Sequence, residues 1–219
     1  MTLDFERIAP SIPFILQGAL VTLEYAGLSI FFGFFLGLLL TLMKLSGIKA
    51  VKWFADAYTS VFRGTPLLVQ LYLIYQGVPE LTGYSITAFE AGILTFSLNS
   101  GAYVSEIIRA GVMAVDKGQM EAALSLGVSY PLAMKDIIFP QAIKNILPAL
   151  VNETINMLKE SALVSVIGES DLLRRANIVA AEKYLYFEPL LIAGAMYYVL
   201  VLILSWVAKH LEIRLARSD

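Results

Sequence analysis

Residues 118–140 read GQMEAALSLGVSYPLAMKDIIFP and form the longest polar interruption in an otherwise strongly apolar chain. The Ala-Ala pair at 122–123 favours a helix and has so little bulk that a partner can approach the backbone closely. Gly127 permits the turn that ends such a helix, including a positive φ. Pro131 suits the start of a second short helix, and we expect Pro140 to break the chain again. The stretch therefore predicts two short helices joined at a glycine, which make a rigid knob.

The composition around this knob indicates an integral membrane protein. Of 219 residues, 58% are hydrophobic and 16% charged, and the mean hydropathy is +0.73, whereas a soluble domain of this length has more charge and fewer long apolar runs. A net charge of −2 gives no argument for a nucleic-acid partner. The absence of cysteine excludes disulfides, thiolate metal sites and cysteine nucleophiles. The single histidine, His210, lies in a basic C-terminal segment, so no metal site is expected.

Five apolar segments predict an all-α membrane protein in which residues 1–219 form a single transmembrane domain. A spanning helix needs roughly 20 mainly apolar residues. The predicted spans are residues 12–43, 66–78 (extended backward by Val61 and Phe62), 86–113, 142–158 and 189–207.

Charge asymmetry predicts the orientation of these spans, because Lys and Arg in short loops mark the cytoplasmic side. Basic residues gather after the first span, around residues 109–144 and in the C-terminal tail. Around the connection between the second and third spans, residues 80–90 include Glu80 and Glu90 but no Lys or Arg. We therefore predict an outside N-terminus and a cytoplasmic C-terminus, as an odd number of spans requires.

Residues 159–188 do not fit the five-span pattern. They mix the apolar run 163–167 with nine charged side chains, which makes them too polar to cross and too apolar for a free loop. We expect short helices packed against the outer half of the bundle.

The knob resembles the cytoplasmic "EAA" loop of ATP-binding-cassette (ABC) importer permeases of the type I, binding-protein-dependent, MetI-like kind. Phe139 stands where that family usually has Leu. The resemblance implies that residues of about 116–140 dock into a separate ATPase subunit and transmit its motion. The residues that match the motif are Glu121, Ala122, Ala123, Gly127, Ile137 and Pro140.

Flanking segments narrow the resemblance to permeases for polar amino acids. They are residues 63–68, 99–103 with Glu106 and Arg109, 118–119, and 158–168, where Glu160-Ser161-Ala162 departs mildly from the usual Asp-Thr-Ser. The same residues also have purely structural interpretations that do not involve substrate recognition. Thr65 can cap a helix whose first residue is Pro66, and Glu106 can pair with Arg109 on one helix face. The Gly33-x-x-x-Gly37 spacing permits close helix packing.

Polar side chains inside a span usually face a partner or a cavity, and Glu153 lies well inside the fourth predicted span. A carboxylate there suits a substrate ammonium, guanidinium or lysine-like group. An alternative is that Glu153 pairs with Lys159 or a helix end and never meets a ligand. Another is that Glu153 is protonated and hydrogen-bonded, since burial disfavours the charged form of a carboxyl. The predicted substrate-binding set is Glu153, Asn152, Asn156, Met157, Asn99, Ser100 and Gln70.

The resemblance implies a plasma-membrane, multi-pass permease subunit that imports polar, preferentially cationic, amino acids. Its implied partners are ATPase subunits, a second permease copy or paralogue, an external amino-acid-binding protein and membrane lipid. The chain has no Gly-x-x-x-x-Gly-Lys-Ser/Thr phosphate loop, so ATP and Mg are expected on the partner ATPase, with no cofactor and no enzymatic activity in this chain. An alternative is a secondary amino-acid transporter or channel subunit that is not coupled to an ATPase. An intramembrane hydrolase is disfavoured because no His–Glu metal pair or Gly-x-Ser-x-Gly elbow is present.

Overall fold

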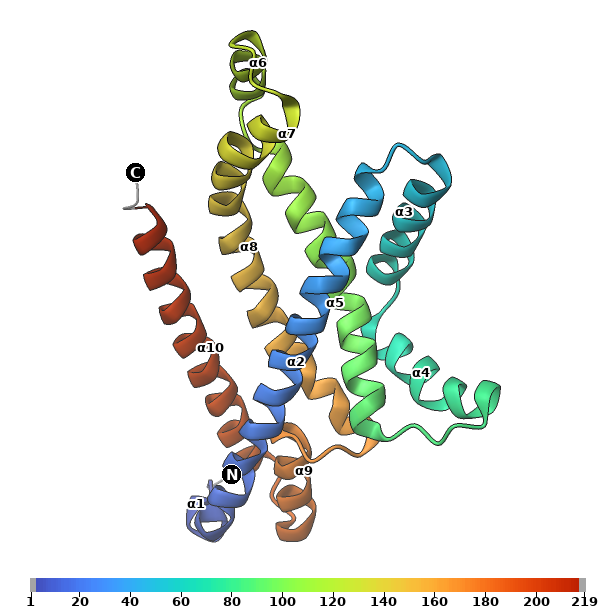
Figure 1. The fold of residues 1–219 in the computed structure, drawn as a ribbon. Coiled ribbons are helices and arrows are strands. Elements are labelled where there is room, and N and C mark those ends of the chain that lie inside the picture. Colours follow the sequence, from blue (N-terminus) through green and yellow to red (C-terminus); the bar gives the residue numbers. More distant parts are fainter. Residues whose placement is uncertain (1–2, 217–219) are drawn as a thin grey trace.

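The computed structural model describes residues 3–216, with side chains through residue 210. Every regular element in this range is helical (Figure 1), which confirms the all-α prediction. The elements are α1 (Phe5–Ile8), η1 (Ala9–Ser11), α2 (Ile12–Leu45), α3 (Lys49–Gly64), α4 (Leu67–Thr82), α5 (Ala88–Met113), α6 (Lys117–Ser125), α7 (Tyr130–Ala133), η2 (Met134–Ile138), α8 (Phe139–Glu160), η3 (Ser161–Ile167), α9 (Leu172–Lys183) and α10 (Phe187–Ala216).

Helices α2 and α5 form the centre of the bundle, and glycines let them pack closely. A Cβ atom at Gly33 would lie 2.7 Å from the Ser100 side chain, and one at Gly37 would lie 2.6 Å from Val104. Real Cβ atoms do not approach other atoms so closely, so only glycine fits at either position. The prediction that the Gly33-x-x-x-Gly37 pattern serves helix packing is confirmed within the chain.

The region between α2 and α5 differs from the prediction. Residues 49–60, which the prediction left between the first two spans, form the amphipathic helix α3 together with residues 61–64, and α4 then leaves in a new direction (Figure 1). With 16 residues, α4 is about 24 Å long, less than the roughly 30 Å apolar thickness of a bilayer. The prediction missed α3 because Lys49, Lys52 and Asp56 lower the hydropathy of a segment whose apolar residues repeat with helical period.

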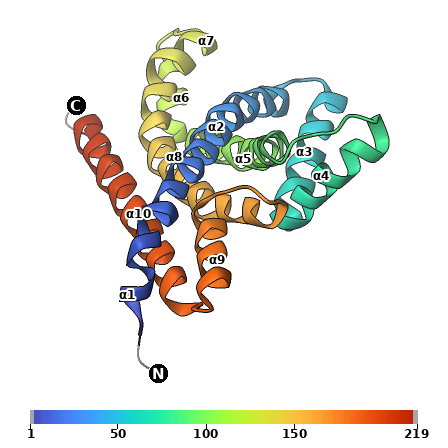
Figure 2. The same cartoon turned by 90° about the horizontal axis from the view of Figure 1, so that it is seen from below.

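Three further parts complete the bundle. Helices α6 and α7 project beyond one end of it, and α8 returns alongside α5. At the other end, η3 and α9 pack against α2, and α9 also packs against α10. The prediction of short helices within residues 159–188 is therefore confirmed. Seen from below, α1, α9 and α10 lie on one side of the α2–α5 pair and α3 and α4 on the other (Figure 2).

Two helical stretches of the described chain are long and apolar enough to span a membrane by length and composition alone. They are Phe5–Leu45, with 41 residues, and Phe187–His210, with 24 residues. The five-span count and the orientation stay predictions.

Candidate coupling loop and substrate site

The glycine turn predicted in the knob is present. Gly127 has a φ of +83° just beyond the end of α6. Its N–H donates to Leu124 O at 3.0 Å, and the Val128 N–H donates to Ala123 O at 3.1 Å. These two bonds satisfy carbonyls that the end of a helix leaves open. At the other end of α6, the Asp116 carboxylate accepts a bond from the Gly118 N–H, so both ends of the helix are closed by local sequence.

Pro140 does not break the chain, contrary to the prediction. Helices α7, η2 and α8 follow one another without interruption, and Pro140 is the second residue of α8. Just before it, the Phe139 N–H donates to Met134 O, five residues back. This π-type turn shifts the hydrogen-bond register, so a residue without an N–H is accommodated at the helix start.

The motif residues of the knob divide between its open surface and its interior. Glu121 and Ala122 are exposed, whereas Ala123 is buried. Ile137 is half-buried and packs against the cluster that joins α5 to α8. Leu126, 84% exposed, directly follows the end of α6. Other exposed apolar side chains of the loop are Leu124, Tyr130 and Leu132. The projecting loop therefore carries exposed apolar side chains beside its polar ones.

Glu153 is buried in the middle of α8, with 7% of its surface exposed. It lies near Ser100 of α5 and Glu160 of its own helix. No ion pair to Glu153 exists in the described part of the chain, so the alternative of a Glu153–Lys159 pair is wrong. The Ser100 hydroxyl has no hydrogen-bond partner of ordinary geometry. The structure thus brings the Glu153 carboxyl and the Ser100 hydroxyl together at the α5–α8 contact, with no cation of the described residues paired to the carboxyl.

Gln70 and Asn99 are already engaged in the fold. The Gln70 amide nitrogen donates to Phe62 O at 2.8 Å and to Thr65 Oγ1 at 2.8 Å. Asn99 donates to Phe62 O and to the Gln70 amide oxygen, both at 3.0 Å. Thr65 itself donates back to Val61 O, so it closes the end of α3 and does not cap α4 as predicted. These amides satisfy the carbonyls freed where α3 stops and α4 starts.

The remaining predicted substrate residues lie on different faces of α8. Asn152 and Asn156 are exposed on one face, as their four-residue spacing predicts. Met157 is fully buried and packs with Tyr25 and Phe96 in the main apolar cluster. Met157 can therefore touch a ligand only if that cluster opens.

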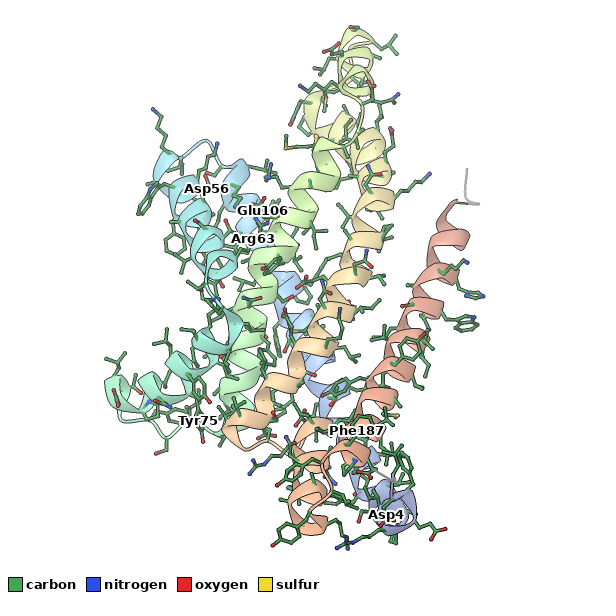
Figure 3. All side chains as sticks on the ribbon, turned by 180° about the vertical axis from the view of Figure 1, so that it is seen from behind. Asp4, Asp56, Arg63, Tyr75, Glu106 and Phe187 are labelled. Atoms are coloured by element: carbon green, nitrogen blue, oxygen red, sulfur yellow. The ribbon has the colours of Figure 1, made fainter. Side chains whose placement is uncertain are left out.

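The sequence interpretation missed most of a charge cluster between α2, α3 and α5. The predicted Glu106–Arg109 pair is present, with Arg109 Nη2 2.7 Å from Glu106 Oε2. Lys44 of α2 also binds Glu106, and Asp56 and Arg63 of α3 flank them (Figure 3). The signal in the sequence was the helical period of residues 49–64, which places Asp56 and Arg63 on one face.

The sequence matches the family of binding-protein-dependent transport system inner membrane components over residues 29–217. The chain therefore belongs to this family, whose members are inner-membrane permease subunits of ABC importers. Its helices have the MetI-like type I permease fold.

Individual relatives agree with this assignment over nearly the whole chain. The arginine transport system permease protein ArtQ of Bacillus subtilis is 54% identical, with 100% of both chains aligned. The putative glutamine transport system permease protein GlnP of Rickettsia bellii is 54% identical over 97% of both. A solved amino acid ABC transporter structure with histidines superposes with a TM-score of 0.94 at 51% identity, covering 98% of this chain and 100% of the other. The MetNI methionine transporter, 19% identical with a TM-score of 0.75 over 94% and 98% of the chains, shares the fold.

Proposed function

We propose that this chain is the membrane-spanning permease subunit of an ATP-driven importer for amino acids with cationic side chains: arginine, lysine and histidine. Relatives named for arginine and for glutamine are equally similar to it, so similarity alone supports only an amino-acid permease. The observation that supports a cationic substrate is Glu153, a buried carboxyl with no cation beside it. A buried carboxylate is strongly disfavoured unless a cation compensates it, and a guanidinium or ammonium group supplies that cation.

The exposed amides of α8 support a substrate path along this helix. Asn145, Asn152 and Asn156 recur at spacings of seven and four residues, so they lie on one face, and all three are exposed. Polar side chains in the middle of a span do not face lipid. This face of α8 is therefore covered in the membrane by a second permease subunit, with a polar path between the two.

The proposed topology has five crossings in the plasma membrane, with the N-terminus outside. Helices α3 and α4 together form the second crossing, broken at residues 64–66. Broken helices inside membranes occur where the freed backbone is buried in protein or lines a cavity. The basic residues around α6 and at the end of α10 support a cytoplasmic knob.

In the proposed mechanism, residues 116–140 dock into the partner ATPase, which binds ATP and Mg. An external binding protein delivers the amino acid, and ATP-driven closure of the two ATPases displaces the knobs. The continuous α7–η2–α8 run transmits this displacement to Glu153, about 20 Å along the helix from Phe139. The alternative, a transporter or channel without an ATPase, predicts uptake that is independent of ATP.

The test is calorimetric binding of a panel of amino acids to the detergent-purified complex, with the wild-type chain and with Glu153→Gln. We expect arginine, lysine or histidine to bind the wild type and binding to weaken at least about 30-fold in the variant, since charge-assisted bonds contribute about 2 kcal/mol. Glu182→Gln, the same change at an exposed residue of α9, is the control and should leave binding unchanged. Unaltered binding by Glu153→Gln would assign recognition elsewhere.

A further inference from the structure

Glu106 is the hub of the charge cluster at the end of the bundle that bears the knob. Its Oε2 accepts bonds from Arg109 Nε at 3.0 Å and Nη2 at 2.7 Å, and its Oε1 accepts a short bond from Lys44 Nζ. Arg63 Nη1 lies 3.8 Å from the same carboxylate. One side chain thus contacts cations from α2, α3 and α5.

Lys44 completes the connection between the helices. Besides Glu106, its Nζ donates to Thr59 Oγ1 of α3 at 2.8 Å and lies 3.6 Å from Asp56 Oδ1. The Lys44 side chain is only 6% exposed, and that of Glu106 is 18% exposed. Charges so deeply buried are retained only when each has its partner. Helices α2 and α5 therefore cannot separate here without leaving Lys44 or Glu106 unpaired.

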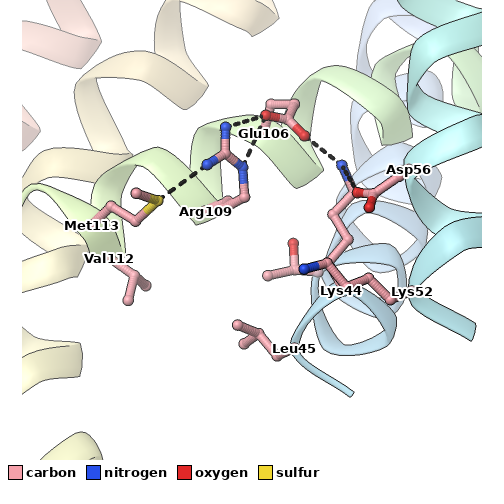
Figure 4. A pocket seen from close by; sticks show the side chains of 9 residues that line it. Lys44, Leu45, Lys52, Asp56, Glu106, Arg109, Val112 and Met113 are labelled. Carbon is pink, nitrogen blue, oxygen red and sulfur yellow. Dashed lines mark hydrogen bonds and ion pairs between the residues drawn. The ribbon is translucent and has the colours of Figure 1, made fainter. Parts of the chain in front are cut away.

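The cluster borders a pocket of about 480 Å³ between the ends of α2, α3 and α5 (Figure 4). Figure 4 shows Glu106 between Arg109 on one side and Lys44 on the other, with Met113 close to Arg109. Arg109 Nη1 lies 3.0 Å from Met113 Sδ, at the last residue of α5. The apolar Leu45 and Val112 line the same pocket and make no polar contact that would replace the charges.

The position of the cluster along the chain gives it a mechanical consequence. Glu106 lies seven residues before Met113, about 10 Å along α5, and only residues 114–116 separate α5 from α6. Any displacement of the knob therefore reaches Glu106 through two rigid turns of helix. If α5 moved alone, the buried Lys44 would lose its main partner.

We infer that Glu106 is a positioning residue that clamps α5 to α2 and α3, so that displacement of the knob moves these three helices as one body. This inference rests on the proposed function, because it concerns how motion of the loop reaches the substrate path. The clamp does not contact the substrate. It sets how much of each ATP-driven displacement of the knob becomes movement of α2, α3 and α5.

The test replaces both buried charges at once, with Lys44→Met and Glu106→Gln, because a neutral pair avoids leaving one charge buried and unpaired. The complete complex is reconstituted in liposomes, and amino-acid uptake and ATP hydrolysis are measured together. We expect ATP hydrolysis within about twofold of the wild type but about threefold less substrate moved per ATP. Glu90→Gln, at the opposite end of α5 in an exposed capping box, is the control and should leave the ratio unchanged.

Two results would overturn the clamp. One is an unchanged ratio of substrate to ATP in the double variant. The other is an equal fall in both activities, which would mean that the charges only stabilise the fold. A wild-type complex without ATP-dependent uptake would instead refute the proposed function, so the two failures are distinguishable.

A second measurement reports the motion directly. The chain has no cysteine, so spin labels can be attached at Trp53→Cys of α3 and Ala110→Cys of α5, both exposed. We expect the wild-type distance between the labels to be the same with and without ATP, and the double variant to lose this constancy. A distance that changes with ATP in the wild type would contradict the clamp.

Discussion

The chain is interrupted by glycine or proline both in the knob and at the α3–α4 junction, but the two interruptions are stabilised differently. In the knob, Gly127 and Asp116 close the ends of α6 through bonds to residues at most five positions away. At the junction, the carbonyl of Phe62 is satisfied by Gln70 and by Asn99, 37 residues away. In water a helix end is cheap to leave open, whereas inside a membrane each open carbonyl costs several kcal/mol. A break in the bundle therefore needs partners supplied by the tertiary structure.

The largest effect is expected from Gly127→Asp in the knob. The added side chain would stand on the surface proposed to meet the ATPase, so uptake should be abolished. The cost to the fold itself is only about 1–2 kcal/mol for a positive φ, and the protein should remain in the membrane. Uptake and membrane content, measured together, separate the two effects.

Gly83→Asp is the matched control, since Gly83 also has a positive φ, +72°, and is exposed at the end of α4. It should impose the same strain without loss of uptake. Normal uptake with Gly127→Asp would show that the loop does not dock an ATPase.

A smaller effect, on stability, is expected from Gln70→Leu at the junction. The change removes the amide that bonds Phe62 O and Thr65 Oγ1 and leaves buried polar groups unsatisfied, at a cost of about 1–3 kcal/mol. The melting temperature of the purified complex should fall by several degrees. Gln76→Leu, exposed on the same helix, should not lower it. If Gln70→Leu melted at the same temperature as the wild type, water would satisfy the open carbonyls of the junction, as it can in the knob.

The smallest effect concerns the start of α9. This helix end is capped by a neighbouring residue, as in the knob, but the cap is buried, as at the α3–α4 junction. Its N-cap, Asp171, is buried, and burial raises the pKa of that carboxyl. Burial, with the nearby charges of Asp171 and Glu24, also raises the pKa of Glu169 above its ordinary value of 4.5. The folded chain thus binds these protons more tightly than the unfolded chain.

The sign of the pH dependence follows from these raised values. The penalty for ionising Glu169 is absent below pH 4.5 and grows as the pH rises through the raised pKa. The melting temperature should therefore be higher at pH 5 than at pH 7, and Glu169→Gln should reduce this difference. A steeper dependence in the variant would contradict the assignment. Melting curves of both proteins at the two pH values provide the comparison.

The interpretation of the sequence succeeded for features set by neighbouring residues. The Gly127 turn and the Glu106–Arg109 pair were predicted, because each depends on bonds within a few positions. The prediction that Pro140 breaks the chain was wrong, because the π-type turn before it has no signal in composition. Helix α3 was missed because one face is apolar and the other charged, and an average of hydropathy along the segment hides this difference.

The candidate site shows the same division. Glu153 was predicted to bind substrate because a carboxyl inside an apolar span is anomalous in any fold, and its role stays a prediction. Gln70 and Asn99 were assigned to substrate for the same reason, yet the structure joins them to each other and to Phe62. Sequence shows that a buried amide needs a partner, but it does not show whether the partner is a ligand or a distant carbonyl.

By itself, the sequence determined the helical class, the family and the closed ends of the knob, because these depend on composition and on contacts between neighbours in the chain. Only the tertiary structure decided which charges meet across α2, α3 and α5, and which amides are consumed by the fold. It also decided that Glu153 has no cation beside it. These outcomes depend on pairings between residues far apart in the chain, which are set by how the helices pack and not by the segments that contain them.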